Sequence, residues 1–550
     1  MSLRVIPLGG LGEIGLNSML FDDGESALLL DAGLMFPDDT MPGVDFVIPD
    51  FGPLGEVAPR LEGLLLSHGH EDHTGAVAFL LKEMDLPVYG TRLTLGLLRN
   101  RLAEHGLADT ARLRTIGRNE RFRLGRFDIE AFPTCHSIPD GVGYILRCSE
   151  GVFVHTGDFK LDPRPPDGVG TDLDRLARLA REEGVTALFS DSTNVEREGI
   201  SPPEATVGET LSEMFRTAPG RVIVAMFSSN LHRIREALNA AARHGRKVAL
   251  CGRSMIGNVA TAIDLECVRL PSPDLLIPVD EAESRPGREV AVLTTGSQGE
   301  PRSALALMAL GEHKTIRIRP GDTVILSSKF IPGNERAIAN VINHLFLAGA
   351  DVRYEKISEI HVSGHASREE LRAMVRAVRP EYFIPVHGEP RHLVMHCALA
   401  RGEGVGSAEF AQNGDVLEFS GGRLSRNGKV PVGRLFVDGK DVGEVEGILL
   451  RDRHHLARSG VVMVVMAVSR AGGELLYGPE VVARGVVSEN GADSIMEDAR
   501  EVVLEVWNGA GSEAKTDMAE LTTGIRKGLR RFFNRRLDRK PMILPVLLEL

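Results

Sequence analysis

The middle of the chain constrains the fold most, because apolar runs of strand length alternate there with amphipathic runs of helix length. Between about residues 205 and 355 the pairs are RVIVAMFSS with LHRIREALNAAARHG, KVALCG with the run from Ser254, EVAVLTTG with PRSALALMALG, and DTVILSS with ERAIANVINHLFLAG. Such alternation is typical of a parallel sheet covered by helices. We therefore predict a separate α/β domain at residues 205–355.

The flanking segments have a different pattern, in which short strands are separated by glycine turns. Glycine accounts for 60 of the 550 residues, and the excess lies between apolar runs. The predicted strands before the α/β domain are VIPL, ALLLDAG, GLLLSH, PVYG, FDIEAF, GYILRC, VFVHTGD and ALFSD, and the clearest helices are TGAVAFLLKEM and LDRLARLAREEG. The same pattern resumes afterwards, so residues 1–204 and 356–420 are predicted to form one domain in two parts.

A smaller unit follows at the C-terminal end. A glycine-rich connector at 421–449 precedes a predicted α+β domain at 450–550, with strands near 460–478, helices near 494–508 and 517–537, and the terminal strand MILPVLLEL. At 550 residues the chain is longer than one ordinary core, in agreement with several domains.

Composition excludes several classes of protein. The longest apolar runs, such as GVVMVVMAV at 460–468, are shorter than the roughly 18 residues of a membrane helix, and MSLRVIPLGG lacks the features of a signal peptide. We therefore expect a cytoplasmic protein with no membrane segment. The five cysteines are widely spaced without a C-x-x-C pattern, which favours reduced thiols, so any metal must be held by histidine and carboxylate.

The charge is unevenly distributed along the chain. A net charge of -12 argues against non-specific coating of nucleic acid, although it is compatible with a local basic surface. Residues 526–540, RKGLRRFFNRRLDRK, contain eight arginines or lysines and one aspartate. Two interpretations stay open for this segment: a solvated helix face, or a surface that contacts phosphates.

One motif near the N-terminus matches the sequence fingerprint of a dinucleotide-binding fold. Residues 10–15, GLGEIG, match G-x-G-x-x-G, and Asp31 stands about where a ribose-binding acid is expected. That fold requires the glycines to open a helix, whereas the following LNSMLFDDGESALLLDAG is typical of strand, turn and strand. We therefore predict a glycine turn between two strands.

A cluster of metal-ligating residue types lies in SHGHEDHTGA at residues 67–76, at the end of the predicted strand GLLLSH. His68 and His70, two apart in an extended chain, face the same side, and Asp72 and His73 begin the turn into the next helix. H-x-H-x-D-H thus offers imidazole and carboxylate to two neighbouring metal ions, the arrangement that a binuclear hydrolytic site needs. Glu71 is expected to be a solvated acid on the opposite side.

Two metal ions need further ligands, and the candidates stand where apolar strands enter Gly, Pro or Ser loops. They are His136 in FPTCHSIPDG, Asp158 in VFVHTGDFK and His387 in YFIPVHGEP. His155, in the same strand as Asp158, is predicted to be a packing residue. His392 and His396 imitate the H-E-x-x-H helix without its glutamate, so they are not predicted to bind metal.

With these residues in place, the chain resembles the metallo-β-lactamase fold, an αββα sandwich that carries its metals along one edge. The α/β domain between Asp158 and His387 makes it similar to the β-CASP nucleases, whose further motifs correspond to Asp191 in LFSDST, His365 in VSGHAS and His387 in PVHGE. GGLGEIGLN, TGDFK and SDSTN extend the resemblance to the bacterial ribonuclease J family, over essentially the whole chain. The resemblance implies an α/β protein with a metallo-β-lactamase sandwich, an inserted β-CASP domain and a small C-terminal α+β domain.

The resemblance also implies a role for each candidate residue. One metal is held by His68, His70 and His136, and the other by Asp72, His73 and His387, with Asp158 as the bridge and Asp31 fixing a ligand imidazole by a hydrogen bond. His365, paired with Asp191, stabilises charge on the phosphorus and protonates the leaving 3′ oxygen, so Asp72, Asp191 and His365 are the candidate catalytic residues. The candidate donors to the RNA and its 5′-phosphate are Ser228 in MFSSN, Ser363 and His365; ordinary turn serines are the alternative for the first two.

The implied function is metal-dependent hydrolysis of single-stranded RNA in RNA maturation and decay, by 5′→3′ exonuclease action that prefers a 5′-monophosphate and by endonuclease action. Two divalent ions per subunit are expected, with Zn²⁺ favoured and Mn²⁺ or Mg²⁺ as alternatives for the activating ion. A homodimer or homotetramer, and other RNA-decay proteins as partners, are also implied. Alternatives with the same metal cluster are a tRNA 3′ processing endonuclease and a thioester or lactone hydrolase, neither of which accounts for the large inserted domain.

Overall fold

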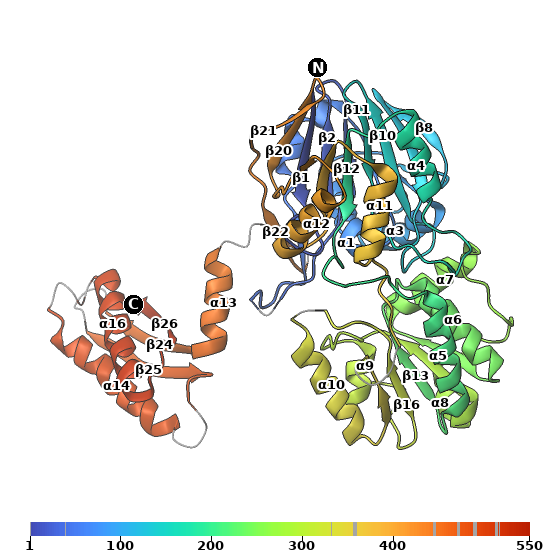
Figure 1. Cartoon of the computed structure of the whole chain (residues 1–550). Coiled ribbons are helices and arrows are strands. Elements are labelled where there is room, and N and C mark those ends of the chain that lie inside the picture. The colour runs from blue at the N-terminus through green and yellow to red at the C-terminus, as the bar shows by residue number, and fades with distance from the viewer. Residues whose placement is uncertain are drawn as a thin grey trace. The chain divides into compact units, whose positions relative to one another are not determined.

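Figure 1 shows the computed structural model, which describes residues 2–38, 40–331, 333–355, 360–439, 441–443, 447–469, 474–487, 492–511, 515 and 517–550. The chain divides into two compact units, one made of Met1–Phe36 and Phe46–Leu435, the other of Pro37–Asp45 and Phe436–Leu550. Among the described residues, no helix combines the length and the apolar character that a membrane crossing requires.

The strand-rich part of the first unit is a sandwich of two sheets. In spatial order, the eight-stranded sheet contains β21 (Arg423–Lys429), β20 (Asp415–Ser420), β1 (Leu3–Gly9), β2 (Ser18–Asp22), β3 (Ala27–Leu30), β5 (Leu61–Leu65), β6 (Val88–Gly90) and β7 (Leu113–Thr115). The seven-stranded sheet contains β19 (Ser407–Ala408), β18 (Tyr382–Val386), β12 (Ala187–Asp191), β11 (Gly151–His155), β10 (Val142–Cys148), β9 (Phe127–Pro133) and β8 (Arg121–Leu124). Buried side chains from both sheets, such as Phe21 of β2 and Phe189 of β12, whose ring centroids are 5.6 Å apart, fill the space between them.

Helices cover this sandwich on the outside. They are α1 (Glu71–Thr74), α2 (Val77–Glu83), α3 (Arg92–Glu104), α4 (Leu173–Glu182), α11 (Arg368–Val378) and α12 (Pro390–Gly402); the part also contains strand β4 (Phe46–Pro49) and the 3-10 turns Gly52–Glu56 and Ala58–Arg60. A second apolar core joins α4, α11 and α12 to the outer face of the seven-stranded sheet. The αββα architecture implied by the resemblance is therefore confirmed.

The inserted part is a five-stranded sheet in which every pairing is parallel. Its strands in spatial order are β14 (Lys247–Cys251), β15 (Val290–Thr294), β13 (Val222–Ala225), β16 (Thr323–Leu326) and β17 (Asp351–Arg353). Alternate residues of β13 point to opposite faces, so Val222 and Val224 pack with α5 (Glu204–Thr217), α6 (Leu231–Arg243) and α7 (Arg253–Asp264). Ile223 and Ala225 pack with α8 (Val279–Ser284), α9 (Ala304–Ala309) and α10 (Glu335–Leu347). The alternation in the sequence thus correctly predicts a parallel sheet with helices on both faces.

The C-terminal part contains a three-stranded sheet and two long helices. Its elements are β22 (Arg434–Asp438), β23 (Asp441–Gly443), α13 (Gly447–Ser459), β24 (Val461–Val468), β25 (Leu475–Arg484), α14 (Ala492–Gly509), α16 (Met518–Leu537) and β26 (Met542–Glu549). Strand β24 pairs antiparallel with β25 and parallel with β26. Apolar side chains of α14 and α16 share one core with this sheet, which confirms the predicted α+β character.

The structure differs from the sequence analysis in a few places. Strand β21 lies inside the predicted connector 421–449, where it pairs antiparallel with β20. Its side chains are mostly exposed, so backbone hydrogen bonds define this strand without an apolar pattern. Helix α3 was also missing from the prediction. The domain boundaries at 204, 355, 420 and 449 stay predictions.

The GLGEIG segment is a turn between β1 and β2, as predicted. Gly10, Gly12 and Gly15 all have positive φ angles, and no helix follows them. The backbone N–H of Gly12 donates to the carbonyl oxygen of Gly388, so the turn lies beside the loop that follows β18.

Candidate metal centre

The candidate ligands come from loops at one end of the sandwich, where strands of both sheets terminate. His68 and His70 follow β5, Asp72 and His73 lie in α1, and three further residues follow β9, β11 and β18: His136, Asp158 and His387. Strand β5 ends at Leu65, earlier than predicted, so His68 and His70 lie in a loop and not in extended strand. The structure nevertheless brings all seven side chains together.

The first group of ligand atoms belongs to three histidines. Nε2 of His68 and Nε2 of His136 lie 3.1 and 3.2 Å from Nδ1 of His70. Ligand nitrogens around a tetrahedral zinc ion, at roughly 2.0–2.1 Å from the metal, are about 3.4 Å apart, so this spacing fits a shared ion. With Asp158, these residues form one group whose ligand atoms all lie within 4.8 Å of one another.

The second group combines two imidazoles with two carboxylates. Nε2 of His73 lies 3.7 Å from Oδ2 of Asp72 and 3.3 Å from Oδ1 of Asp158. Nε2 of His387 lies 3.4 Å from the same Asp72 oxygen. Asp72, His73, Asp158 and His387 thus form a second set with metal-binding geometry.

Asp158 belongs to both groups, and its two oxygens face different sides. Oδ2 lies 3.7 Å from Nε2 of His68 and 3.7 Å from Nε2 of His136, whereas Oδ1 contacts His73 and accepts a hydrogen bond from Nδ1 of His387 at 2.8 Å. Oδ2 of Asp158 and Nε2 of His387 are buried without a hydrogen-bond partner among the described residues. Buried polar atoms without partners are costly, and a cation between the groups would satisfy both.

The protonation of the imidazoles also fits a cation site. Burial lowers the pKa of His68 and of His136 well below the usual value, and that of His70 to about 4, so these three are neutral and free to bind metal. Burial opposes the charge on His387 too, but Asp158 and Asp72 raise its pKa to about 10. The pKa of His73 is also raised well above its usual value, since the attraction of Asp158, Asp72 and Asp31 outweighs the effect of burial. In the metal-free chain, protons on these two rings supply the positive charge that divalent ions would supply.

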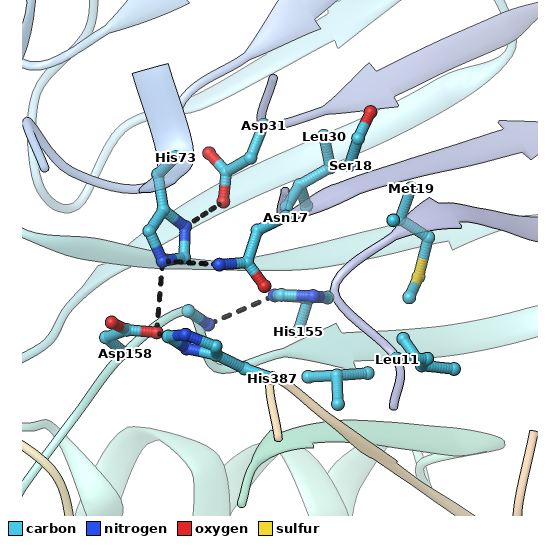
Figure 2. Close-up of a pocket in the computed structure, with 13 residues that line it drawn as sticks. Leu11, Asn17, Ser18, Met19, Leu30, Asp31, His73, His155, Asp158 and His387 are labelled. Atoms are coloured by element: carbon cyan, nitrogen blue, oxygen red, sulfur yellow. Dashed lines mark hydrogen bonds and ion pairs between the residues drawn. The ribbon is translucent and has the colours of Figure 1, made fainter. Parts of the chain in front are cut away.

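A network of hydrogen bonds behind the ligands fixes their orientation. Oδ2 of Asp31 accepts a hydrogen bond from Nδ1 of His73 at 2.7 Å (Figure 2). Ser67 donates to both Asp31 oxygens, through its N–H and through its hydroxyl. The amide nitrogen of Asn17 approaches the other edge of this ring, 3.1 Å from Nε2 of His73, the nitrogen that faces the second metal group. Nδ1 of His136 donates to the carbonyl oxygen of Gly364 at 2.7 Å. A ligand imidazole whose other nitrogen is held in this way keeps one orientation and one tautomer.

A third group contains the other two predicted residues. Nδ1 of His365 lies 2.8 Å from Oδ2 of Asp191, the last residue of β12, and 3.8 Å from Oδ2 of Asp158. Thr193 holds the other oxygen of Asp191 through its N–H and its hydroxyl. Burial opposes ionisation of both partners, but their mutual attraction raises the pKa of His365 and lowers that of Asp191. His365 is one-fifth exposed, which leaves its far edge accessible to a substrate.

Two residues of the centre adopt a backbone conformation that is rare for side-chain-bearing residues. Asp31 has φ 59° and His387 has φ 52°, both in the left-handed region. Such conformations cost about 1–3 kcal/mol and are retained where the surroundings enforce them, commonly at functional sites.

The remaining candidates lie outside the three metal groups. Glu71 is exposed, as expected. His155 is buried against Phe189 and accepts a hydrogen bond from the N–H of Gly157, which confirms its packing role. His392 contacts Glu196, and His396 contacts Ser192.

The two candidate serines hold different positions. The Ser363 hydroxyl accepts a hydrogen bond from the Asn194 amide at 2.7 Å and another from the N–H of His365 at 3.2 Å. Ser228 follows β13 and accepts from the Asn258 amide at 3.3 Å.

Several supporting residues were missed by the sequence analysis. Asn17, Ser67 and Thr193 are short polar side chains without a metal-ligand signature, and Gly364 acts through its carbonyl oxygen. All four lie within motifs that the sequence analysis uses: Asn17 in GGLGEIGLN, Ser67 in SHGHEDHTGA, Thr193 in SDSTN and Gly364 in VSGHAS. Position within these motifs is therefore the signal that could have drawn attention to them.

Family models match four segments of the chain. They are a beta-lactamase superfamily domain at residues 29–224, a ribonuclease J beta-CASP domain at 219–345, a Zn-dependent metallo-hydrolase RNA specificity domain at 349–408, and a ribonuclease J C-terminal domain at 448–550. The catalytic fold, the inserted domain and the C-terminal domain each have a counterpart in this set.

Curated relatives match the chain along its whole length. Ribonuclease J of Synechocystis sp. is 41% identical over 99% of this chain and 86% of its own length, and that of Thermus thermophilus is 40% identical over 100% and 95%. Ribonuclease J2 of Bacillus subtilis is 38% identical over 100% and 99%. A solved structure of a protein of unknown function from Enterococcus faecalis matches with a TM-score of 0.53 at 15% identity, over 76% of this chain and 100% of that one, which supports the fold alone.

Proposed function

The chain belongs to the ribonuclease J family, and from that premise we propose that it hydrolyses single-stranded RNA, removing nucleotides from the 5′ end and also cutting internally. The observation that carries the proposal is the pair of metal groups that share Asp158 beside the His365–Asp191 pair. We further propose that the ions are zinc, with manganese or magnesium as alternatives.

The ligand assignment follows from the two groups. His68, His70 and His136 would hold one ion and Asp72, His73 and His387 the other, with one oxygen of Asp158 directed to each. Two bound divalent ions supply Lewis acidity that activates water and neutralises charge on the phosphodiester. Asp31 keeps the ring of His73 in position through the 2.7 Å hydrogen bond.

His365 is placed to act on the leaving group. Its Nδ1 is held by Asp191, so the ring presents Nε2 and can donate a proton from it to the departing 3′ oxygen. The same cation stabilises negative charge that develops on the phosphoryl oxygens.

The inserted domain provides a candidate site for the 5′ end of the RNA. In parallel sheets, ligands bind beyond the carboxyl ends of the strands where the strand order reverses, and β13 stands at such a point between β15 and β16. Ser228 follows β13, and Ser363 lies beside His365. We include these hydroxyls as phosphate donors, which accounts for a preference for 5′-monophosphate.

The test uses a single-stranded RNA labelled at its 5′ end, with either a 5′-monophosphate or a 5′-hydroxyl, and Zn²⁺, Mn²⁺ or a chelator. We expect metal-dependent release of labelled mononucleotide, faster from the monophosphate and strongly reduced in the His365→Ala variant. The His392→Asn variant is the matched control, because His392 is also a buried histidine of this unit with an acidic partner, Glu196, but lies outside the metal groups. Intact RNA under every metal, with hydrolysis of a thioester or lactone instead, contradicts the proposal.

The expected assembly is part of the same proposal. Family membership supports a cytoplasmic homodimer or homotetramer that works with other RNA-decay proteins. Light scattering of the purified chain, coupled to size-exclusion chromatography, tests the oligomeric state directly.

A further inference from the structure

Helix α16 has two chemically distinct sides. At 3.6 residues per turn, the apolar residues Leu521, Ile525, Leu529 and Phe533 form one stripe, and all four are buried in the core of the C-terminal part. The rest of the helix surface carries most of the basic residues, whereas Arg536 continues the line of the apolar stripe beyond Phe533. The exposed ones are Arg526, Lys527, Arg530, Arg531, Arg535 and Arg536, followed after the end of the helix by Arg539 and Lys540.

Two of these charges have partners among the described residues, and the others do not. Arg536 lies 3.9 Å from Asp498 of α14, and Arg539 donates to the carbonyl oxygens of Gly485 and Val486. The side chains of the other six have no hydrogen bond or ion pair with any residue that the structure describes. We name these six the basic face: Arg526, Lys527, Arg530, Arg531, Arg535 and Lys540.

The neighbouring helix does not neutralise the basic face. Helix α14 is acidic and lies beside α16 (Figure 1). The two helices are so close that a Cβ built at Gly524 or at Gly528 would touch the side chain of Val506. Even so, Arg536 and Asp498 form the one ion pair between the two helices among the described residues. Helix packing therefore rests on apolar contacts, and the basic residues remain available for an external anion.

The chain as a whole carries a net charge of -12, so a dense positive surface on one helix opposes the general character of the protein. The repulsion between neighbouring cations has a small energetic cost, and no ion pair with a described residue offsets it for the six side chains of the basic face. A polyanion would offset it. Because Phe532 and Phe533 are not exposed, the basic face offers charge without rings on which bases could stack.

We propose that the basic face of α16 binds the phosphate backbone of RNA, as a contact separate from the metal centre. From Arg526 to Arg535 the helix rises about 14 Å at roughly 1.5 Å per residue. One strand of a duplex, with a phosphate about every 3.4 Å along its axis, places about four phosphates along that length. The contact recognises charge and is indifferent to base sequence.

The experiment measures RNA binding by the full-length chain in a chelator, so that no RNA is cut. We compare the unaltered chain with the triple variant Lys527→Gln, Arg530→Gln, Arg531→Gln by titrating an unstructured labelled RNA at several salt concentrations. We expect the affinity to fall on the order of ten-fold, and the slope of log K against log salt to become shallower by about 2, since each lost contact with a single strand contributes roughly 0.7.

Two control variants test separately whether the position of the substitutions and the loss of charge cause the effect on RNA affinity. The variant Arg178→Gln, Arg181→Gln, Arg423→Gln removes the same charge from exposed sites on α4 and β21, and we expect it to bind as the unaltered chain does. The variant Lys527→Arg, Arg530→Lys, Arg531→Lys keeps the charge and should keep the affinity. Thermal unfolding of all four proteins checks that each is folded.

The inference is overturned when the triple variant binds RNA as well as the Arg178, Arg181, Arg423 variant does, which would assign the basic face to another kind of partner. It stands apart from the proposed function, because binding in chelator requires no hydrolysis. A chain that shows the binding difference but never cuts RNA would contradict the proposed function alone.

Discussion

The metal centre gathers charged groups from separate segments between Asp31 and His387 and buries them against one another, whereas the basic face displays charges to solvent along one helix and just after its end. In the centre, each carboxylate faces an imidazole at 2.7 to 3.9 Å. On α16, the six side chains of the basic face have no partner among the described residues.

The difference shows how burial changes the energetic effect of losing a charge or its partner. A buried charge that loses its partner is left uncompensated in a medium of low dielectric constant, so single substitutions in the centre have large effects. An exposed charge is screened by water and salt, so single substitutions on α16 have small effects that add up. The predictions below test this contrast, starting from the largest effect.

Substitution Asp158→Asn should abolish most of the activity. Asp158 belongs to all three groups of metal-binding geometry, and the amide removes the negative charge between them. We expect RNA hydrolysis to fall by roughly 10³-fold or more, the range found when a central catalytic group is lost. Rates of RNA cleavage and metal content by elemental analysis check this. Near-normal activity and metal content would show that the carboxylate is not the bridge.

Substitution Asp31→Asn should have an intermediate effect, because Asp31 orients His73 and does not reach the metal side of the ring. Removal of such a supporting partner lowers metal affinity by about 10–100-fold. Titration with Zn²⁺ against a competing chelator measures the loss. Excess metal should restore most of the activity, a rescue that is not expected for Asp158→Asn.

Two glycine substitutions compare the tolerance of the backbone in the two regions. A Cβ at Gly33 would lie 1.7 Å from the carbonyl oxygen of Asp72, so Gly33→Ala must displace a ligand segment and should destabilise the protein by about 1–3 kcal/mol. A Cβ at Gly524 of α16 would lie 3.2 Å from Cγ1 of Val506, a contact that a small shift relieves. The gain in helix propensity, about 1 kcal/mol, should leave Gly524→Ala within about 1 kcal/mol of the unaltered chain. Denaturant unfolding measures the stability of both variants. Equal losses of stability would contradict the expected difference between the two regions.

The single substitution Arg530→Gln should have the smallest effect. One of the six exposed cations changes, so RNA affinity in chelator is expected to fall by about two- to three-fold, with a salt slope shallower by roughly 0.7. Salt-dependent titration resolves this difference. A loss as large as that of the triple variant would indicate a specific pocket in place of a diffuse surface.

Local sequence patterns predicted those features that depend on neighbouring residues. Strand and helix periodicity predicted the parallel sheet around β13 and the helices α14 and α16. Each of these elements buries one face, so its apolar residues recur along the sequence at the period of a strand or a helix. Strand β21 was missed for the same reason, since its exposed side chains carry no such spacing.

The candidate site also contains residues that the local sequence indicated and residues that it did not. The H-x-H-x-D-H run between His68 and His73 indicated metal chemistry by itself, because four candidate ligands so close together have few other uses. His136, Asp158 and His387 became candidates from their strand-end positions and from the family resemblance, which also supplied the pairing of His365 with Asp191. Those two are 174 positions apart, and their 2.8 Å contact has no local signal.

The sequence by itself therefore determined the types of ligand, the succession of elements and the basic composition of α16. Only the tertiary structure decided that the two oxygens of Asp158 face different groups, that Asp31, held by Ser67, fixes the ring of His73 from behind, and that five cations of α16 and Lys540 remain without a partner among the described residues. The physical reason is distance in the sequence. These contacts join atoms of distant segments that folding brings within a few ångströms, and the spacing of residues along the chain does not predict which segments come into contact.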